Sequence, residues 1–174
     1  MAAAAYMSCS RIYNDYDGVQ HDYTRKQGLV WQQVFLPDIA PAEWADREIL
    51  WNAVEEAEKT KDSRLAREFV AALPVELGRG QWIALLTEFI QTNFVAEGMC
   101  ADVCIHDTDG HNPHAHIMLT VRSLTREGSW GWGQSDFSES RTPSHFDGLL
   151  AQFSVLFCHL PSLHKGRTVS MIWA

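Results

Sequence analysis

The segment IHDTDGHNPHAHIMLT, residues 105–120, decides the fold and carries the densest chemistry of the chain. Apolar and polar residues alternate from 114 onward, as in a strand with one buried face, and residues 100–106 have a similar character. Between them, DTDGHNP at 107–113 has the Asp-Gly pair and the proline of a turn. The segment therefore predicts a hairpin of two antiparallel strands, 100–106 and 114–122.

Three histidines of this hairpin are expected to meet on one face of the sheet. His114 and His116 are two residues apart, so both imidazoles leave the same side of a strand. His106 ends the neighbouring strand, close to the other two. Three imidazoles on one face can hold a divalent metal ion and leave positions open for a substrate oxygen.

The same residues allow two other interpretations. The histidines could be surface residues beside a turn, and His111, within the loop, is expected to be exposed rather than a ligand. Alternatively, Cys100, Cys104 and His106 could form a zinc site, although three residues between two cysteines of one strand is a poor ligand spacing.

In the residues before the hairpin, the spacing of apolar residues and the positions of Gly and Pro predict five more elements. These are a short helix at 2–10 carrying Tyr6, a strand at 29–36, a helix at 42–60, a strand at 65–73 and a helix at 80–96. This order predicts an α+β fold, with a largely antiparallel sheet and helices packed on one face.

Composition restricts the class of protein. A chain of 174 residues, 46% hydrophobic and 21% charged, fits one soluble domain. No run reaches the ~18 consecutive apolar residues of a membrane span. Four scattered cysteines and no export signal favour a cytoplasmic location. The formal net charge of −8 argues against nucleic-acid binding, which relies on Lys and Arg contacts with phosphates.

Five segments resemble the MobA/MobL family, plasmid mobilisation relaxases of the HUH endonuclease superfamily. They are AAAAY at 2–6, DYTRK at 22–26, LWNAVEEAEKTKDSRLARE at 50–68, ALPVEL at 72–77 and GMCADVCIHDTDGHNPHAHIMLT at 98–120. The resemblance runs in order through most of residues 2–122. It implies a relaxase-like fold and an enzyme that nicks one DNA strand at a plasmid origin of transfer, remaining attached to the new 5′ end.

The resemblance also implies roles for five residues. The metal ligands would be His106, His114 and His116, and the nucleophile would be Tyr6, forming a 5′-phosphotyrosyl intermediate. Glu68 would orient a ligating histidine or accept the tyrosine proton. Without the resemblance, Tyr6 would be interpreted as a core tyrosine and Glu68 as a solvated or ion-paired carboxylate. Family resemblance favours Mg²⁺ or Mn²⁺, whereas imidazole ligands also suit Zn²⁺, Ni²⁺ or Co²⁺.

Partners follow from the same resemblance. They would be single-stranded plasmid DNA at the origin of transfer, accessory mobilisation proteins and the coupling proteins of type IV secretion. No membrane interaction is expected.

The chain departs from the family pattern in three places, of which the first and the last predict a fragment with two regions. The alanine run follows Met1 directly, without the first strand and the Gly/Ser/Arg-rich loop that are usual in the family. Val70 stands at a position where a second acidic residue is common. The resemblance fades after Arg122. We expect an N-terminally truncated relaxase-like domain at 1–122, lacking the first strand, and a divergent tail at 123–174 that is frameshifted or poorly ordered.

The sequence leaves three functions open. The first is a metal-dependent DNA strand transferase, or nickase, acting in conjugative mobilisation. The second is an inactive relaxase remnant that at most binds metal or single-stranded DNA. The third is an unrelated zinc hydrolase that would use the three histidines and a bound water without a tyrosine.

Overall fold

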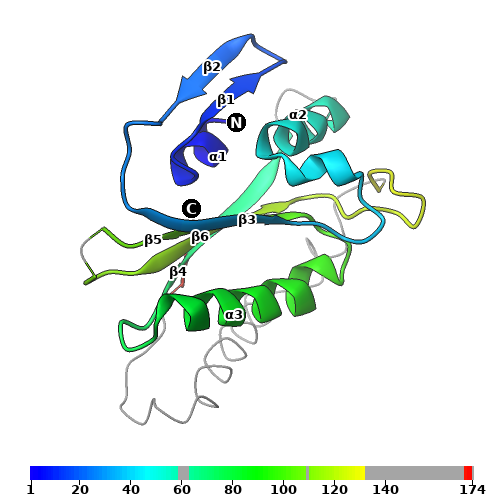
Figure 1. Cartoon of the computed structure of the whole chain (residues 1–174). Helices are drawn as coiled ribbons and strands as arrows, with labels where there is room; N and C mark the ends of the chain where they lie inside the picture. The colour runs from blue at the N-terminus through cyan, green and yellow to red at the C-terminus, as the bar shows by residue number, and fades with distance from the viewer. Residues whose placement is uncertain (59–62, 109, 132–170, 174) are drawn as a thin grey trace.

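A five-stranded antiparallel sheet organises the molecule (Figure 1). The computed structural model describes residues 1–58, 63–108 and 110–131 and the backbone of 171–173. The strands lie in the order β3-β5-β6-β4-β7. Their bounds are Leu29–Phe35 for β3, Ala66–Ala72 for β4, Ala101–His106 for β5, His114–Thr120 for β6 and Met171–Trp173 for β7. The predicted α+β class with a largely antiparallel sheet is confirmed.

The hairpin of β5 and β6 lies at the centre of the sheet, in the register that its alternation predicts. His106 pairs with His114, and Cys104 pairs with His116. Successive residues of each strand face opposite sides of the sheet, and directly paired residues face the same side. The sheet therefore has one apolar face, called here the aliphatic face after Val103, Ile105 and Ile117 although it also includes Phe35 and Phe69, and another face that carries the histidines.

The aliphatic face is covered by α3 (Arg79–Ile90) and by the π-helical turn η2 (Gln91–Val95) that continues it. Phe89 and Phe94 are buried in this core and pack edge to face. Burying such a ring stabilises the fold by about 1.5–3 kcal/mol. The helix expected at 80–96 is thus present, with its last turn in π geometry.

The opposite face is covered by helices as well. Here lie α1 (Ala2–Met7), η1 (Ala42–Ala45) and α2 (Arg47–Ala57), together with a small hairpin of β1 (Arg11–Asn14) and β2 (Val19–Asp22) (Figure 1). Buried residues from α1 and α2 share a second core with Cys100, Cys104 and Met118. The helices consequently occupy both faces of the sheet rather than the single face expected.

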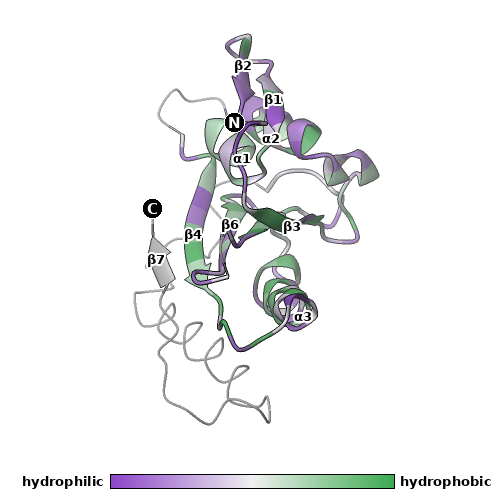
Figure 2. Ribbon diagram, turned by 60° about the vertical axis from the view of Figure 1, so that its left-hand side comes forward, coloured by the Kyte–Doolittle hydropathy of each residue, from purple (hydrophilic) through white to green (hydrophobic). Residues whose placement is uncertain are grey.

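Two local differences from the sequence-based expectations have clear physical causes. The helix expected at 42–60 is divided at Asp46, whose carboxylate accepts hydrogen bonds from the amides of Glu48 and Ile49 and caps α2. The β1–β2 hairpin is not among the elements expected from the sequence. Its four-residue strands are too short to show a period, and Figure 2 shows this hairpin as mostly hydrophilic.

The predicted tail is represented by few described residues. β7 pairs with the outer edge of β4, with Phe69 opposite Trp173. Residues 132–170 lie outside the described part, so the division at 122/123 and the order of the tail stay predictions. Within the described ranges, every helix is too short or too polar to cross a membrane.

Candidate functional site

Three imidazole rings converge at one end of the central hairpin, on the face that α1 covers. The ring centroids of His106, His114 and His116 lie 5.0–5.6 Å apart. One potential ligand nitrogen from each ring lies within 4.8 Å of the other two. The convergence follows from the register, because His114 is directly opposite His106 and His116 is two residues further along the same strand.

Hydrogen bonds fix which nitrogen of two rings remains available. Nδ1 of His114 contacts the carbonyl oxygen of Asn112 at 2.7 Å, and Nδ1 of His116 contacts Oε1 of Glu68 at 3.3 Å. Oxygens of this kind only accept, so each Nδ1 is the donor, and in the neutral form of each ring the lone pair is on Nε2. Such outer hydrogen bonds are typical of metal-ligating histidines.

His106 is held differently. Its Nε2 donates to the carbonyl oxygen of Met7 at 2.5 Å, and its Nδ1 accepts from the ammonium of Lys26 at 2.9 Å. Burial lowers the pKa of His106 to about 4, and the nearby charge of Lys26 acts in the same direction. The ring is therefore neutral at neutral pH, which is the form that can bind a metal ion.

The donor set fits a divalent metal ion. Three imidazoles with polar outer partners are a common ligand set for Mn²⁺, Co²⁺, Ni²⁺ or Zn²⁺. The cysteine alternative fits less well, since burial raises the pKa of the Cys100 thiol to about 12 and keeps it protonated. Within the described ranges, the three histidines form the one group with metal-site geometry.

Tyr6 lies beside the triad and not in the core. Its helix α1 is anchored by the fully buried Ala4, Ala5 and Met7, whereas Tyr6 itself is 46% exposed. The rings of Tyr6 and Tyr23 pack edge to face, with their centroids 5.4 Å apart. The ammonium of Lys26 lies 4.3 Å from the centroid of the Tyr6 ring. The interpretation of Tyr6 as a core tyrosine is thus wrong.

Glu68 projects from β4 toward the triad. Its carboxylate contacts His116, and both side chains are largely buried. The contact favours the role of orienting a ring over that of a solvated surface acid. Val70, where the family commonly has a second acid, lies on the same face, directly opposite His116. An apolar side chain therefore occupies that position.

Comparison with known proteins now identifies the family. The MobA/MobL family model matches residues 1–146. The chain belongs to the MobA/MobL family.

Individual relatives of the chain are named for conjugal transfer or mobilization. The conjugal transfer protein TraA of Agrobacterium fabrum is 43% identical over 137 residues, which cover 72% of this chain. A probable mobilization protein MobA of Bifidobacterium longum is 37% identical over 131 residues, or 74% of this chain. The chain spans only 12% of the length of that TraA and 23% of that MobA.

One solved structure extends the similarity to three dimensions. It was reported as "Molecular Basis of Vancomycin Resistance Transfer in Staphylococcus aureus" and is 31% identical in sequence. The match has a TM-score of 0.79 and covers 89% of this chain and 80% of the other.

Sequence reasoning had singled out most, but not all, of this MobA/MobL site. The three histidines lie together, Glu68 contacts His116, and His111 is exposed as expected. Tyr6 contacts Lys26, which in turn contacts His106. Lys26 and Tyr23 were quoted only as part of a family-like segment. No periodicity marks them, because they lie in the connection between β2 and β3, and only the fold brings them to the triad.

Replacing Glu68 with alanine is expected to weaken metal binding by roughly 10- to 100-fold, because His116 loses the carboxylate that orients its ring. Titration of the purified protein with Mn²⁺ in a calorimeter measures the change. Glu76→Ala, which removes an exposed carboxylate in the turn after β4, is the matched control. Equal affinities for the two variants would show that Glu68 does not support the ligand set.

Proposed function

We propose that this MobA/MobL chain contains the catalytic centre of a metal-dependent DNA strand transferase. It would nick one strand at a plasmid origin of transfer during conjugative mobilisation, through a 5′-phosphotyrosyl intermediate. The family membership and the names of the relatives support conjugative DNA transfer as the process.

One observation carries the proposal: a single ammonium group touches both halves of the site. Lys26 contacts the ring of Tyr6 on one side and Nδ1 of His106 on the other. A phenol and a metal-type triad are thereby held within reach of one phosphate group. A zinc hydrolase acting through water would need the triad alone, so the position of Tyr6 favours transfer to tyrosine.

In the proposed reaction, the phenolic oxygen of Tyr6 attacks the scissile phosphorus. A phosphorus–oxygen bond to tyrosine forms as the bond from phosphorus to the 3′ oxygen breaks. The phenol loses its proton, and the departing 3′ oxygen gains one. The product ester is similar in energy to the one broken, so the strand can later be rejoined. Placement of Tyr6 on a helix anchored to the sheet limits the entropy cost of attack.

A divalent ion would be held by His106, His114 and His116. We propose Mg²⁺ or Mn²⁺ for this position by family resemblance, and the donor set also suits Zn²⁺, Ni²⁺ and Co²⁺. Such an ion supplies Lewis-acid polarisation of a phosphate oxygen and offsets charge that develops during attack. Glu68 keeps the His116 ring in the orientation that presents Nε2.

The proposed partners are single-stranded plasmid DNA, accessory mobilisation proteins and type IV secretion coupling proteins. The proposed location is the cytoplasm, where such DNA is processed.

The decisive experiment detects the covalent intermediate. The protein is incubated with Mn²⁺ and a pool of single-stranded oligonucleotides that carry a randomised centre and a 3′ fluorophore. We expect a fluorescent protein band on a denaturing gel that disappears when EDTA is added. Cleavage without an attached protein would indicate the hydrolase instead. Metal binding with neither cleavage nor adduct would indicate the inactive remnant.

A further inference from the structure

The ammonium of Lys26 occupies the position at His106 where a metal ion would be expected. In His106, the nitrogen that carries a proton faces the carbonyl oxygen of Met7, which can only accept. The remaining lone pair, on Nδ1, points at the Lys26 ammonium. His114 and His116, in contrast, use their outer hydrogen bonds to leave Nε2 as the nitrogen with a lone pair. A positive charge therefore already sits on the one nitrogen of His106 whose lone pair could bind a metal ion.

We propose that Lys26 substitutes for the metal ion at His106 in the metal-free protein and moves onto the DNA phosphate when an ion displaces it. The ammonium and a divalent cation cannot share one lone pair, and their like charges repel at such a short distance. Binding of the ion thus requires Lys26 to leave Nδ1.

The released ammonium has one obvious place to go. Lys26 already lies over the ring of Tyr6, whose phenolic oxygen is proposed to attack phosphorus. A phosphate oxygen brought to Tyr6 would be within reach of a flexible four-carbon side chain carrying three donors. Lys26 would then bind the anionic substrate beside its nucleophile. This second half of the inference rests on the proposed function, whereas the first half concerns metal binding alone.

Lys26→Met separates these two effects because it keeps an unbranched side chain, one atom shorter, and removes the charge. Without the competing ammonium, Mn²⁺ is expected to bind roughly 10-fold more tightly than to the unaltered protein. At saturating Mn²⁺, the rate of adduct formation is expected to fall roughly 10- to 100-fold, because a charged contact with phosphate is lost. Arg25→Met removes the neighbouring, exposed positive charge and serves as the control for both measurements. Lys26→Arg should retain part of the adduct formation.

The opposite signs distinguish this role from a structural one, since a damaged site would lose both metal affinity and activity. Unchanged or weaker Mn²⁺ binding by Lys26→Met would overturn the proposal that Lys26 takes the place of the metal ion at His106. Tighter binding with an unchanged rate of adduct formation at saturating Mn²⁺ would overturn the phosphate contact. If the unaltered protein forms no adduct, the proposed function fails, and the titration still decides the first half.

A second measurement reads the ligand atom directly. Zn²⁺ is added to protein labelled with ¹⁵N in its histidines, and the ring nitrogens are followed by NMR. We expect Nδ1 of His106 to shift on binding, together with Nε2 of His114 and His116. A shift at Nε2 of His106 would mean that the ion displaces the Met7 carbonyl instead of Lys26, which contradicts the proposal.

Discussion

Tyr6→Phe is expected to abolish the covalent DNA adduct, with a loss of at least ~10³-fold, because the nucleophilic oxygen is the only group removed. The phenyl ring keeps its contacts with Tyr23 and Lys26. Metal affinity and the midpoint of thermal unfolding should therefore match those of the unaltered protein. The gel assay with the 3′-labelled pool measures the adduct, and a Mn²⁺ titration verifies the triad.

Tyr23→Phe is the matched control for this change. Tyr23 supplies the second phenol of the site, in edge contact with Tyr6. Its variant should keep adduct formation within a few-fold of the unaltered protein. An adduct that persists in Tyr6→Phe and disappears in Tyr23→Phe would transfer the nucleophilic role to Tyr23.

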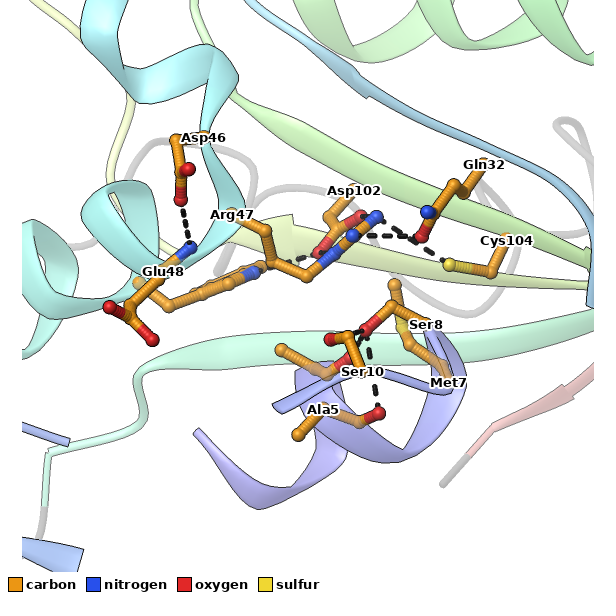
Figure 3. Close-up of polar contacts among 12 residues, drawn as sticks. Ala5, Met7, Ser8, Ser10, Gln32, Asp46, Arg47, Glu48, Asp102 and Cys104 are labelled. Atoms are coloured by element: carbon orange, nitrogen blue, oxygen red, sulfur yellow. Dashed lines mark hydrogen bonds and ion pairs between the residues drawn. The ribbon is translucent and has the colours of Figure 1, made fainter. Parts of the chain in front are cut away.

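The second large effect concerns stability. Asp102→Ala is expected to lower the free energy of unfolding by about 3–5 kcal/mol, because it leaves the largely buried guanidinium of Arg47 without its charge partner. Asp102 is fully buried on β5, and its carboxylate accepts from Nε and Nη2 of Arg47 at 2.7 Å and from Nε1 of Trp51 at 2.9 Å (Figure 3). The network ties α2 to the strand that carries His106. Thermal denaturation should show a midpoint lowered by about 10 °C.

Two further variants test this explanation. Asp22→Ala breaks an exposed ion pair with Arg11 and should shift the midpoint much less. In the double variant Asp102→Leu with Arg47→Leu, neither charge is left without its partner, so the loss should be smaller than the sum of the two single losses. Equal shifts for Asp102→Ala and Asp22→Ala would show that the buried pair contributes no more than a surface pair.

The central part of the fold was predictable because its residues satisfy two patterns at once. In β6 the alternation of His114 and His116 with aliphatic residues fixed both the strand and its faces. In α3 the broad apolar stripe matched the helical period, and Phe89 and Ile90 are fully buried as a result. Patterns of this kind reflect burial directly, so they can be recognised without any knowledge of the neighbouring elements.

The other face of the sheet could not be predicted, because its cover comes from distant segments with weak patterns. α1 packs through Ala4 and Ala5, whose small side chains give no strong amphipathic signal. Asp102 is polar yet fully buried, and the Arg47 that accounts for its burial lies 55 residues earlier in the sequence. The distribution of helices over both faces follows from such contacts, which no local period encodes.

For the candidate site, the sequence identified residues of unusual chemistry but not their environment. Spacing and a hairpin register were sufficient to group His106 with His114 and His116. Lys26 is an ordinary basic residue in a connection, and its contacts with Tyr6 and His106 arise only when that connection folds across the end of the sheet. Its importance became visible only from the three-dimensional positions.

The pairing of β5 with β6 tolerates no error of one residue. Ile105 and Ile117 alternate with His106 and His116 along the two strands. Slippage of β6 by a single position would turn His114 and His116 toward α3 and move Ile117 to the face that carries His106. Correct alignment of β5 and β6 during folding is therefore what brings the three imidazoles together, and a chain trapped one residue out of register would lack the triad.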